Sequence, residues 1–356
     1  MLSELNLSLL FIFLFLLSFF VTYLIAKYSI FLFSGALLDK DFLKPQAFHK
    51  EPTGRVGGIA ILFLFSLFVS FYFFASGIFL KDYFTISLLL FFLGFLDDVK
   101  IKINPNVRLV LMLVLLLFCI DFFSIQISKS GLAFLDVWLE NNIFQTCFVL
   151  LCFLFIVNGA NLVDGFNGLL AIQFLLINSI FLLINLFNQN ENISIILFAQ
   201  IIIVSSFLLF NFPKAKIFLG DSGSYLLGAL IAFNTIKTYE LNLNISPFFL
   251  TSILFYIFYE VFFSFIRKLL KKRSPFKPDN SHLHMLIYQF LDKSKKVSNA
   301  NYKTSFLINF FYFILVLPSI YFCENGNFSR YYFFFLIFIY TIIYYYLYNL
   351  KINENN

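Results

Sequence analysis

Three short segments of this chain place carboxylates among glycines, amides and hydroxyls. Asp97 and Asp98 are adjacent at the end of an apolar stretch, where paired carboxylates are costly unless they bind a cation, a proton or a basic partner. Asn161 and Asp164 are three residues apart, so both can lie on one helical face and offer oxygen ligands. Asp221 stands between glycines near a helix start, a pattern that suits contact with a metal ion or a phosphate.

Each of these segments also has a purely structural interpretation. An aspartate pair at a helix end can be solvated and paired with a nearby cation such as Lys100, and Asn and Asp are ordinary cap and turn residues. Capping accounts for Asp221 by itself but not for the glycines on both sides of it. Residues 158–169 hold four polar side chains, including Asn167, and three glycines, which is more than a simple reversal between helices needs.

A fourth segment brings together cations and imidazoles. Arg273 ends a basic run, and His282 and His284 follow it. Two histidines at i, i+2 are weak evidence for a metal site, because a helix would point them apart, but as hydrogen-bond donors they suit phosphate oxygens. The alternative for the basic run is a topology signal or a lipid-headgroup patch. Arg55, beside glycines at another helix start, could approach a phosphate or a headgroup, although a turn-rich loop explains it equally well.

The elements that must position these residues are membrane-spanning helices. Hydrophobic residues form 61% of the 356 positions and charged residues only 12%, so a soluble fold could not bury the apolar surface. The apolar stretches have the length of a spanning helix and no period-two alternation. We therefore predict an all-α, polytopic integral membrane protein with about eleven spans. They lie near 6–26, 56–76, 83–96, 108–124, 143–157, 169–187, 193–212, 224–238, 247–266, 304–322 and 331–349.

The distribution of charge predicts a topology for these spans. With eleven spans, 21 of the 25 Lys and Arg residues fall on one side, which the positive-inside rule makes cytoplasmic. The N-terminus is then outside and the C-terminus cytoplasmic, in a single transmembrane domain over residues 1–356. All the polar segments described above, and all three histidines including His49, lie in or beside the cytoplasmic side. The loops that carry these candidate functional residues are predicted at 27–55, 97–108, 158–168, 213–223 and 267–303, all on the cytoplasmic side.

These segments, in this order and at these helix ends, resemble the polyprenyl-phosphate N-acetylhexosamine-1-phosphate transferase family over about residues 6 to 322. The resemblance implies transfer of a sugar 1-phosphate from a UDP-N-acetylhexosamine to undecaprenyl phosphate, with release of UMP. It implies Mg²⁺ as cofactor, with Mn²⁺ as the alternative. The metal ligands would be Asp221, Asp164 and Asp98, and the catalytic residues Asp97, Asp98 and Asp164. The substrate-binding residues would be Asn161, Asn167, His282, His284, Arg273, Arg55 and Lys100.

The chain departs from the family pattern at three positions. Asn167 stands where many members have Asp, Gly54 where a Pro-Thr-Pro-Arg sequence is common, and Met285 where several have a third histidine. The basic run leading into Ser-Pro-Phe favours the branch that uses UDP-N-acetylglucosamine or a related sugar and starts a lipid-linked surface glycan such as an O-antigen. The alternative within the family is the phospho-MurNAc-pentapeptide transferase of peptidoglycan synthesis.

A secondary transporter is the main alternative from another class, because intramembrane acids and broken helices also mark ion pathways. The acids here gather at one membrane face instead of the midplane, with only Asp121 and Glu260 in or close to an apolar span, and no internal repeat is visible. A non-catalytic scaffold would leave the acidic loops without a role. We expect an inner-membrane protein whose site faces the cytoplasm, with no nucleic-acid partner; whether it forms a homodimer is left open.

Overall fold

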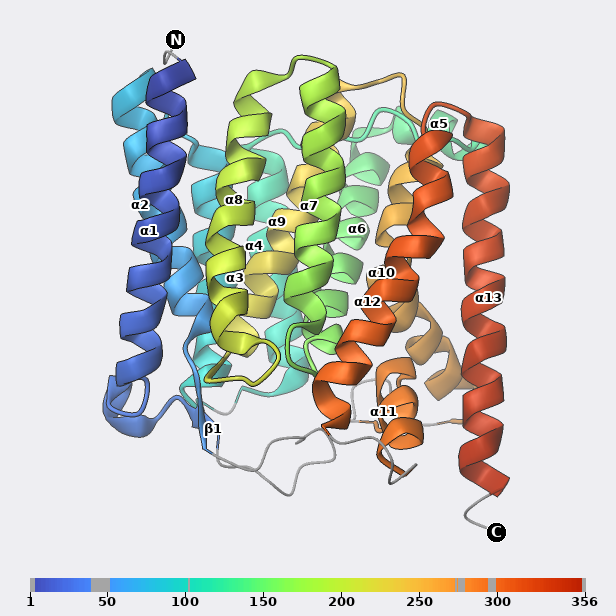
Figure 1. The fold of residues 1–356 in the computed structure, drawn as a ribbon. Helices are drawn as coiled ribbons and strands as arrows, with labels where there is room; N and C mark the ends of the chain where they lie inside the picture. Colours follow the sequence, from blue (N-terminus) through green and yellow to red (C-terminus); the bar gives the residue numbers. More distant parts are fainter. Residues whose placement is uncertain are drawn as a thin grey trace.

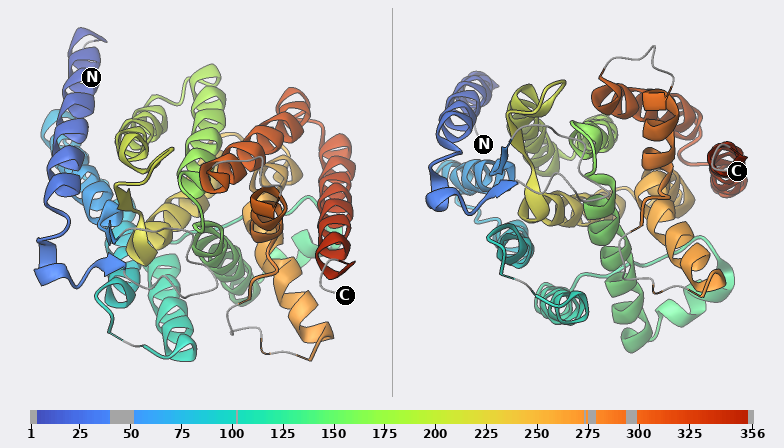
Figure 2. Two further views of the ribbon diagram at one scale, coloured as in Figure 1. Left: turned by 60° about the horizontal axis from the view of Figure 1, so that its bottom comes forward. Right: turned by 90° about the horizontal axis from the view of Figure 1, so that it is seen from below.

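The fold is a bundle of long helices that run between two ends of the molecule (Figures 1 and 2). The computed structural model describes residues 4–39, 52–101, 103–272, 274, 279–293 and 299–353. The described helices are α1 (Glu4–Tyr28), α2 (Gly57–Ser76), α3 (Lys81–Asp98), α4 (Pro105–Phe122), α5 (Ala133–Leu139), α6 (Asn142–Val163), α7 (Leu169–Phe187), α8 (Glu191–Asn211), α9 (Gly220–Leu241), α10 (Pro247–Leu270), α11 (Leu283–Lys293), α12 (Ala300–Tyr321) and α13 (Gly326–Asn353), with a 3₁₀ turn at Leu32–Gly35.

The eleven predicted spans each coincide with one of these helices to within a few residues. Over the described residues, nine helices are long and apolar enough to cross a membrane, and the chain is a multi-pass membrane protein. The two predicted spans outside those nine are α3 and α9. The all-α prediction is confirmed, while the count of eleven and the orientation stay predictions.

Helix α9 occupies the middle of the bundle, where it packs against α2, α3, α6 and α7. Nearly every side chain from Ser222 to Tyr239 is buried. A helix enclosed by protein on all sides does not need a lipid-facing surface, and small residues on it allow neighbouring backbones to approach closely. Gly228 does this against α6, since a Cβ there would stand 2.8 Å from the Cα of Val157. This burial explains why α9 is less apolar than the outer helices.

A small sheet at one end of the bundle was not predicted. β1 (Leu38–Asp39) pairs antiparallel with β2 (Thr53–Arg55), and β2 pairs parallel with β3 (Ile217–Phe218). Strand β3 leads directly into α9, so the sheet joins the start of α9 to the segment that precedes α2. Strands of two or three residues carry too little alternation to be recognised in a sequence.

The predicted loop 158–168 is shorter in the structure than expected. Helix α6 continues to Val163, so Asn161 lies on the last turn of a helix and Asp164 is its C-cap residue. The backbone hydrogen bond from Asp164 N–H to Ala160 O, 3.1 Å long, shows that the helical pattern persists through the polar residues. Polar side chains alone do not end a helix, and the turn comes only at Gly165–Gly168.

Candidate active site

The site is built around the first turn of α9. The last residue of α3, Asp98, is 1% exposed, and its two carboxylate oxygens accept the backbone N–H groups of Asp221 and Ser222, each at 2.9 Å. These N–H groups have no partner within the helix, so the carboxylate satisfies them and complements the positive end of the helix dipole. Asp98 therefore fixes where α9 begins and where the Asp221 side chain emerges.

Two glycines allow this contact between α3 and α9. Gly220 has φ +79°, and a Cβ on it would lie 2.6 Å from Oδ2 of Asp98. At Gly94, one turn before Asp98 on α3, the backbone of Asp221 occupies the space that an added Cβ would need. Only glycine leaves room for the two backbones and the intervening carboxylate.

Asn161 of α6 binds the same helix start from another side. Its Nδ2 donates to Oδ1 of Asp221 at 3.1 Å and to Oγ of Ser224 at 2.9 Å. The predicted face shared by Asn161 and Asp164 is thus directed toward Asp221. Because Asn161 donates to one oxygen of Asp221, the other oxygen is the one that faces the cations of the site.

Arg108 belongs to the site although it was not among the residues predicted from the sequence. It lies on the first turns of α4, forms an ion pair with Asp97 and has Nη1 3.7 Å from Oδ2 of Asp221. Its guanidinium also lies 5.9 Å from the ring centre of Tyr225. A signal was present in the sequence, because apart from Asp121 Arg108 is the one charged residue of an otherwise apolar span, and intramembrane charges are usually functional.

Arg55 approaches the site from strand β2. Its Nη2 lies 2.7 Å from Oδ2 of Asp39 on β1, and its Nη1 lies 3.8 Å from Oδ1 of Asp98. The small sheet positions this guanidinium, since β2 is held between β1 and β3. The structure thus places Arg55 beside the acidic cluster, while its predicted contact with a phosphate or headgroup stays a prediction; Asp39 is a further carboxylate that the sequence did not indicate.

The pKa of Asp164 reflects the burial and the charges of the site. Burial, followed by the negative charges of Asp221 and Asp98, raises the pKa of the Asp164 carboxyl to about 8, against an opposing effect of Arg55. Among the described residues, five carboxylates (Asp39, Asp97, Asp98, Asp164 and Asp221) surround two guanidinium groups (Arg55 and Arg108). The excess of negative charge indicates a place for a cation.

The donor set fits an open magnesium site. In the part of the chain described, no three carboxylate, imidazole or thiolate groups are close enough to enclose an ion by themselves. Mg²⁺ is usually held by one or two carboxylates, several waters and substrate phosphates, so a closed cage is not required. Asp221 and Asp164 are partly exposed and suit this role, whereas both oxygens of Asp98 already accept backbone N–H groups.

The two histidines lie together beside the Asp164 loop. Their rings are parallel, with centroids 5.5 Å apart, and they are 3% and 0% exposed for His282 and His284. Neither nitrogen of His284 has a hydrogen-bond partner among the described residues, and its ring packs edge-on against Phe166 with centroids 5.7 Å apart. Burial lowers the pKa of His284 to about 4, so the ring is neutral at pH 7. An unpartnered buried imidazole costs free energy, which a ligand could recover.

Two other predicted residues, Asn167 and Lys100, do not join the acidic cluster. The side chain of Asn167 donates to Pro213 O at 2.9 Å, and its backbone N–H donates to Oδ1 of Asn301 at 3.0 Å, so it joins the loop after α6 to the segment after α8 and to the start of α12. Lys100 lies two residues after the end of α3, in a left-handed conformation (φ +62°) and with an exposed side chain. Arg273, like His49, lies outside the described residues.

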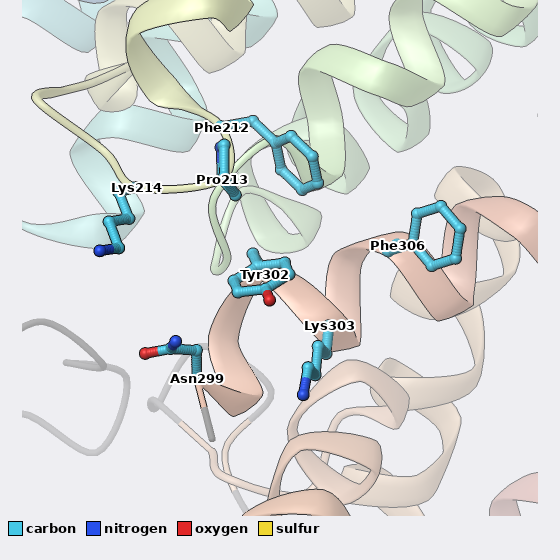
Figure 3. Close-up of a pocket in the computed structure, with 7 residues that line it drawn as sticks. All are labelled: Phe212, Pro213, Lys214, Asn299, Tyr302, Lys303 and Phe306. Carbon is cyan, nitrogen blue, oxygen red and sulfur yellow. The ribbon is translucent and has the colours of Figure 1, made fainter. Parts of the chain in front are cut away.

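A hollow of about 510 Å³ lies next to the loop that Asn167 braces (Figure 3). It is open at the surface between the segment after α8 and the start of α12. None of the predicted site residues within the described ranges lines it, so it is distinct from the acidic cluster. The side chains around it are Phe212, Pro213, Lys214, Asn299, Tyr302, Lys303 and Phe306.

Chemically, the acidic cluster combines groups suited to binding a cation with groups suited to binding phosphate oxygens. Guanidinium groups, an amide and partly exposed carboxylates meet where helix α9 begins, at the end of the bundle that also carries the histidines. Such a set can hold a divalent ion against the oxygens of a diphosphate and offset the repulsion between two anionic substrates.

Comparison with known proteins agrees with this chemistry. The model of glycosyl transferase family 4 matches residues 80–239, which include Asp97, Asp98, Asn161, Asp164 and Asp221. The undecaprenyl-phosphate alpha-N-acetylglucosaminyl 1-phosphate transferase of Thermotoga maritima is 30% identical over 282 residues, covering 79% of this chain and 81% of the relative. A phospho-N-acetylmuramoyl-pentapeptide-transferase of Dictyoglomus turgidum is 31% identical, covering 61% and 71%.

A probable undecaprenyl-phosphate N-acetylglucosaminyl 1-phosphate transferase of Bacillus subtilis is 28% identical, covering 68% of this chain and 67% of the relative. The similarity to the Thermotoga protein extends over most of both chains, and the residues matched by the family model include the acidic site. The chain belongs to glycosyl transferase family 4 and is a membrane-bound transferase.

Proposed function

We propose that this protein transfers N-acetylhexosamine 1-phosphate, from UDP-N-acetylglucosamine or a related UDP-sugar, to undecaprenyl phosphate. An oxygen of the lipid phosphate forms a bond to the sugar-bearing phosphorus, the bond between the two phosphates of the donor breaks, and UMP leaves. The product is a lipid-linked sugar diphosphate that begins a cell-surface glycan. Whether the transfer occurs in one step or through a phospho-aspartate is left to experiment.

One observation carries this proposal. Asp98, Asn161 and Arg108, from three different helices, meet Asp221 at the first turn of the central helix. The cluster lies at an end of a membrane-spanning bundle, where a water-soluble donor and the headgroup of a lipid acceptor can both reach it. A site in the middle of the bundle would suit an ion pathway better.

The residues of the site have distinct roles in this reaction. Asp221 and Asp164 would hold Mg²⁺, which when bound supplies positive charge to the diphosphate oxygens. Arg108 and Arg55 orient the phosphates, while Asp98 keeps the start of α9 in place. Asn161 orients the Asp221 carboxylate, and the histidines approach from the Asp164 side. Asp97 is engaged with Arg108 and tunes its position.

We further propose that the site faces the cytoplasm of the inner membrane. The supporting observation is the excess of Lys and Arg in the segments on that side of the predicted topology. In the structure α1 begins at one end of the bundle and α13 ends at the other, as an odd number of spans requires (Figure 1). UDP-sugars are made in the cytoplasm, so a site on this side meets its donor.

The test is UMP release by the purified full-length protein in lipid nanodiscs, with UDP-N-acetylglucosamine, undecaprenyl phosphate and Mg²⁺. Asp221→Asn should abolish release. Asp121→Asn is the matched control, because Asp121 is an exposed aspartate at the opposite end of α4 and should leave the rate unchanged. No release by the wild type with any UDP-N-acetylhexosamine would refute the proposed function.

The same assay separates the alternative within the family. Relatives of both kinds match this chain, and those named N-acetylglucosaminyl transferases include the Thermotoga protein that covers 79% of it. UDP-MurNAc-pentapeptide is therefore run in parallel as donor. UMP release with this donor and none with UDP-N-acetylglucosamine would assign the protein to peptidoglycan synthesis.

A further inference from the structure

The segment that carries the histidines is anchored residue by residue. Residues 279–282 precede α11, and each of them contacts a side chain of α10 or α13. The four contacts are Asp279 to Arg267 at 2.6 Å, Asn280 O to Lys351 Nζ at 3.3 Å, Ser281 O to Tyr344 OH at 3.0 Å, and His282 Nδ1 to Glu260 Oε1 at 3.0 Å. Such dense anchoring of an irregular segment indicates that its exact position matters.

Glu260 is the centre of this arrangement. It lies on α10 and is 1% exposed, within a span that otherwise has charges only in its last turns. Oε1 accepts from His282 Nδ1 and from the N–H of Leu283 at 3.2 Å, and Oε2 accepts from Tyr340 OH at 2.6 Å. A buried carboxylate is costly, and a well-packed apolar residue usually serves a purely structural contact at least as well.

The contact fixes the orientation of the His282 ring. An ionised carboxylate only accepts, so the proton of the hydrogen bond resides on Nδ1. The opposite ring nitrogen, Nε2, is then directed away from Glu260. Imidazoles that bind metals or substrates are commonly held in this way by a carboxylate on the second nitrogen. The ring of His284 lies parallel to that of His282.

Helix α13 contacts Glu260 through Tyr340, the first of a row of three tyrosines. Tyr340, Tyr344 and Tyr348 recur every four residues, with consecutive rings nearly parallel at 6.4 Å and 5.8 Å. Tyr340 binds Glu260 and Tyr344 binds Ser281 O, whereas Tyr348 accepts from Lys271 Nζ at 2.6 Å. Residues of this last helix lie outside the family match at 80–239.

We propose that Glu260, oriented by Tyr340 of α13, is a positioning residue that holds His282 in the tautomer and orientation needed at the substrate phosphates. The inference rests on the proposed function, since it assumes that His282 serves the phosphate chemistry. It gives the last helix a part in catalysis, although none of its residues reaches the acidic cluster in the contacts described.

A double-mutant cycle tests whether Glu260 acts through His282. Glu260→Gln keeps the shape and an acceptor oxygen but removes the charge, and should lower kcat/KM about tenfold. His282→Ala should lower it about 100-fold. The double variant should match His282→Ala to within about twofold, because the positioned group is already gone. A double variant about tenfold below His282→Ala would show independent effects and overturn the proposal.

A conservative change on α13 tests the role of the last helix. Tyr340→Phe removes one hydroxyl from Glu260 and should lower kcat of the folded protein about three- to tenfold, with a thermal melt to correct for any loss of stability. Tyr346→Phe is the matched control: Tyr346 is 65% exposed on the same helix and should behave as wild type. Equal rates for the two variants would remove α13 from the mechanism.

Histidine NMR gives a readout that does not depend on activity. The chain has three histidines, so ¹⁵N-histidine labelling gives three ring systems, which His49→Gln and His284→Gln assign. His282 should be protonated on Nδ1 in the wild type and should lose this preference in Glu260→Ala. A wild-type ring protonated on Nε2 alone would overturn the proposal, and so would one that Glu260→Ala leaves unchanged. Absence of UMP release by the wild type would refute the proposed function while leaving this measurement interpretable.

Discussion

Replacing Gly220 by alanine should disable the site, and the structure shows why. Gly220 combines a left-handed backbone (φ +79°) with direct contact to the Asp98 carboxylate, 2.6 Å from an added Cβ. The chain contains a matched control. Gly77, at the C-cap of α2, has nearly the same backbone (φ +73°), but a Cβ there would meet nothing within 4 Å. Both substitutions strain a left-handed backbone, but only Gly220→Ala also displaces the Asp98 carboxylate.

The expected magnitudes follow from these contacts. A left-handed alanine costs about 1–2 kcal/mol, so Gly77→Ala should lose about that much stability. In Gly220→Ala, Asp98 must also move by about 0.8 Å to reach ordinary van der Waals distance. This movement strains two hydrogen bonds to a charged group, each contributing about 1.5–3 kcal/mol. Gly220→Ala should therefore lose about 2–5 kcal/mol more than Gly77→Ala.

The catalytic effect should be larger than the loss of stability suggests. Asp98 fixes the first turn of α9, and a misplacement of about 1 Å at a reacting group can cost about 100-fold in rate. UMP release by folded protein should fall about 100-fold in Gly220→Ala and less than threefold in Gly77→Ala. A thermal melt of each variant in nanodiscs corrects for unfolded protein. Equal activity of the two variants would refute the assignment of Asp98 as the anchor of the site.

Three further predictions concern the acidic cluster. Burial and like charges raise the pKa of Asp164 to about 8, so a proton on Asp164 competes with Mg²⁺ below that pH. The affinity for Mg²⁺, measured by titration calorimetry, should therefore rise by up to tenfold per pH unit from about pH 6 to pH 8. Asp164→Asn should flatten this dependence. Arg108→Gln should lower kcat/KM about 10- to 100-fold in the UMP assay and Arg108→Lys less, since only a charged group keeps the ion pair with Asp97. Asn161→Ala should weaken Mg²⁺ binding about tenfold in the same calorimetry, because Asp221 loses the amide that orients it; an unchanged affinity would separate Asn161 from the metal site.

The fold could be predicted from sequence because long apolar stretches depend on local composition alone. All eleven predicted spans coincide with helices, and the spans predicted at 83–96 and 143–157 are longer helices in the structure, α3 and α6, that carry polar residues at their ends. The small sheet could not be predicted, because its strands have two or three residues and pair across the chain between residues near 54 and 217. Contacts between distant short segments leave no periodic pattern in either segment.

The acidic part of the site could be predicted for a related reason. Carboxylates in an apolar chain are conspicuous, so Asp98, Asn161 and Asp221 were identified from their type and spacing. The function of each could not be separated, because the sequence does not show that Asp98 uses both oxygens to cap α9 while Asp221 keeps one oxygen toward Arg108. Glu260 was noticed as an intramembrane acid, but its link to His282 depends on the packing of α10 against the segment before α11.

The start of α9 explains how one site can draw on helices that are far apart in the chain. Asp98 of α3 and Asn161 of α6 both bind its first turns, and the N–H of Gly58 at the start of α2 donates to Leu219 O at 2.9 Å. Each of these neighbours is a separate span packed against the central helix. A shift of α9 along its axis would therefore move Asp221 relative to all three contacts at once. The precision of the acidic site thus depends on the packing of the buried helix, which explains why a helix at the centre of a membrane protein retains small and polar residues in its first turns.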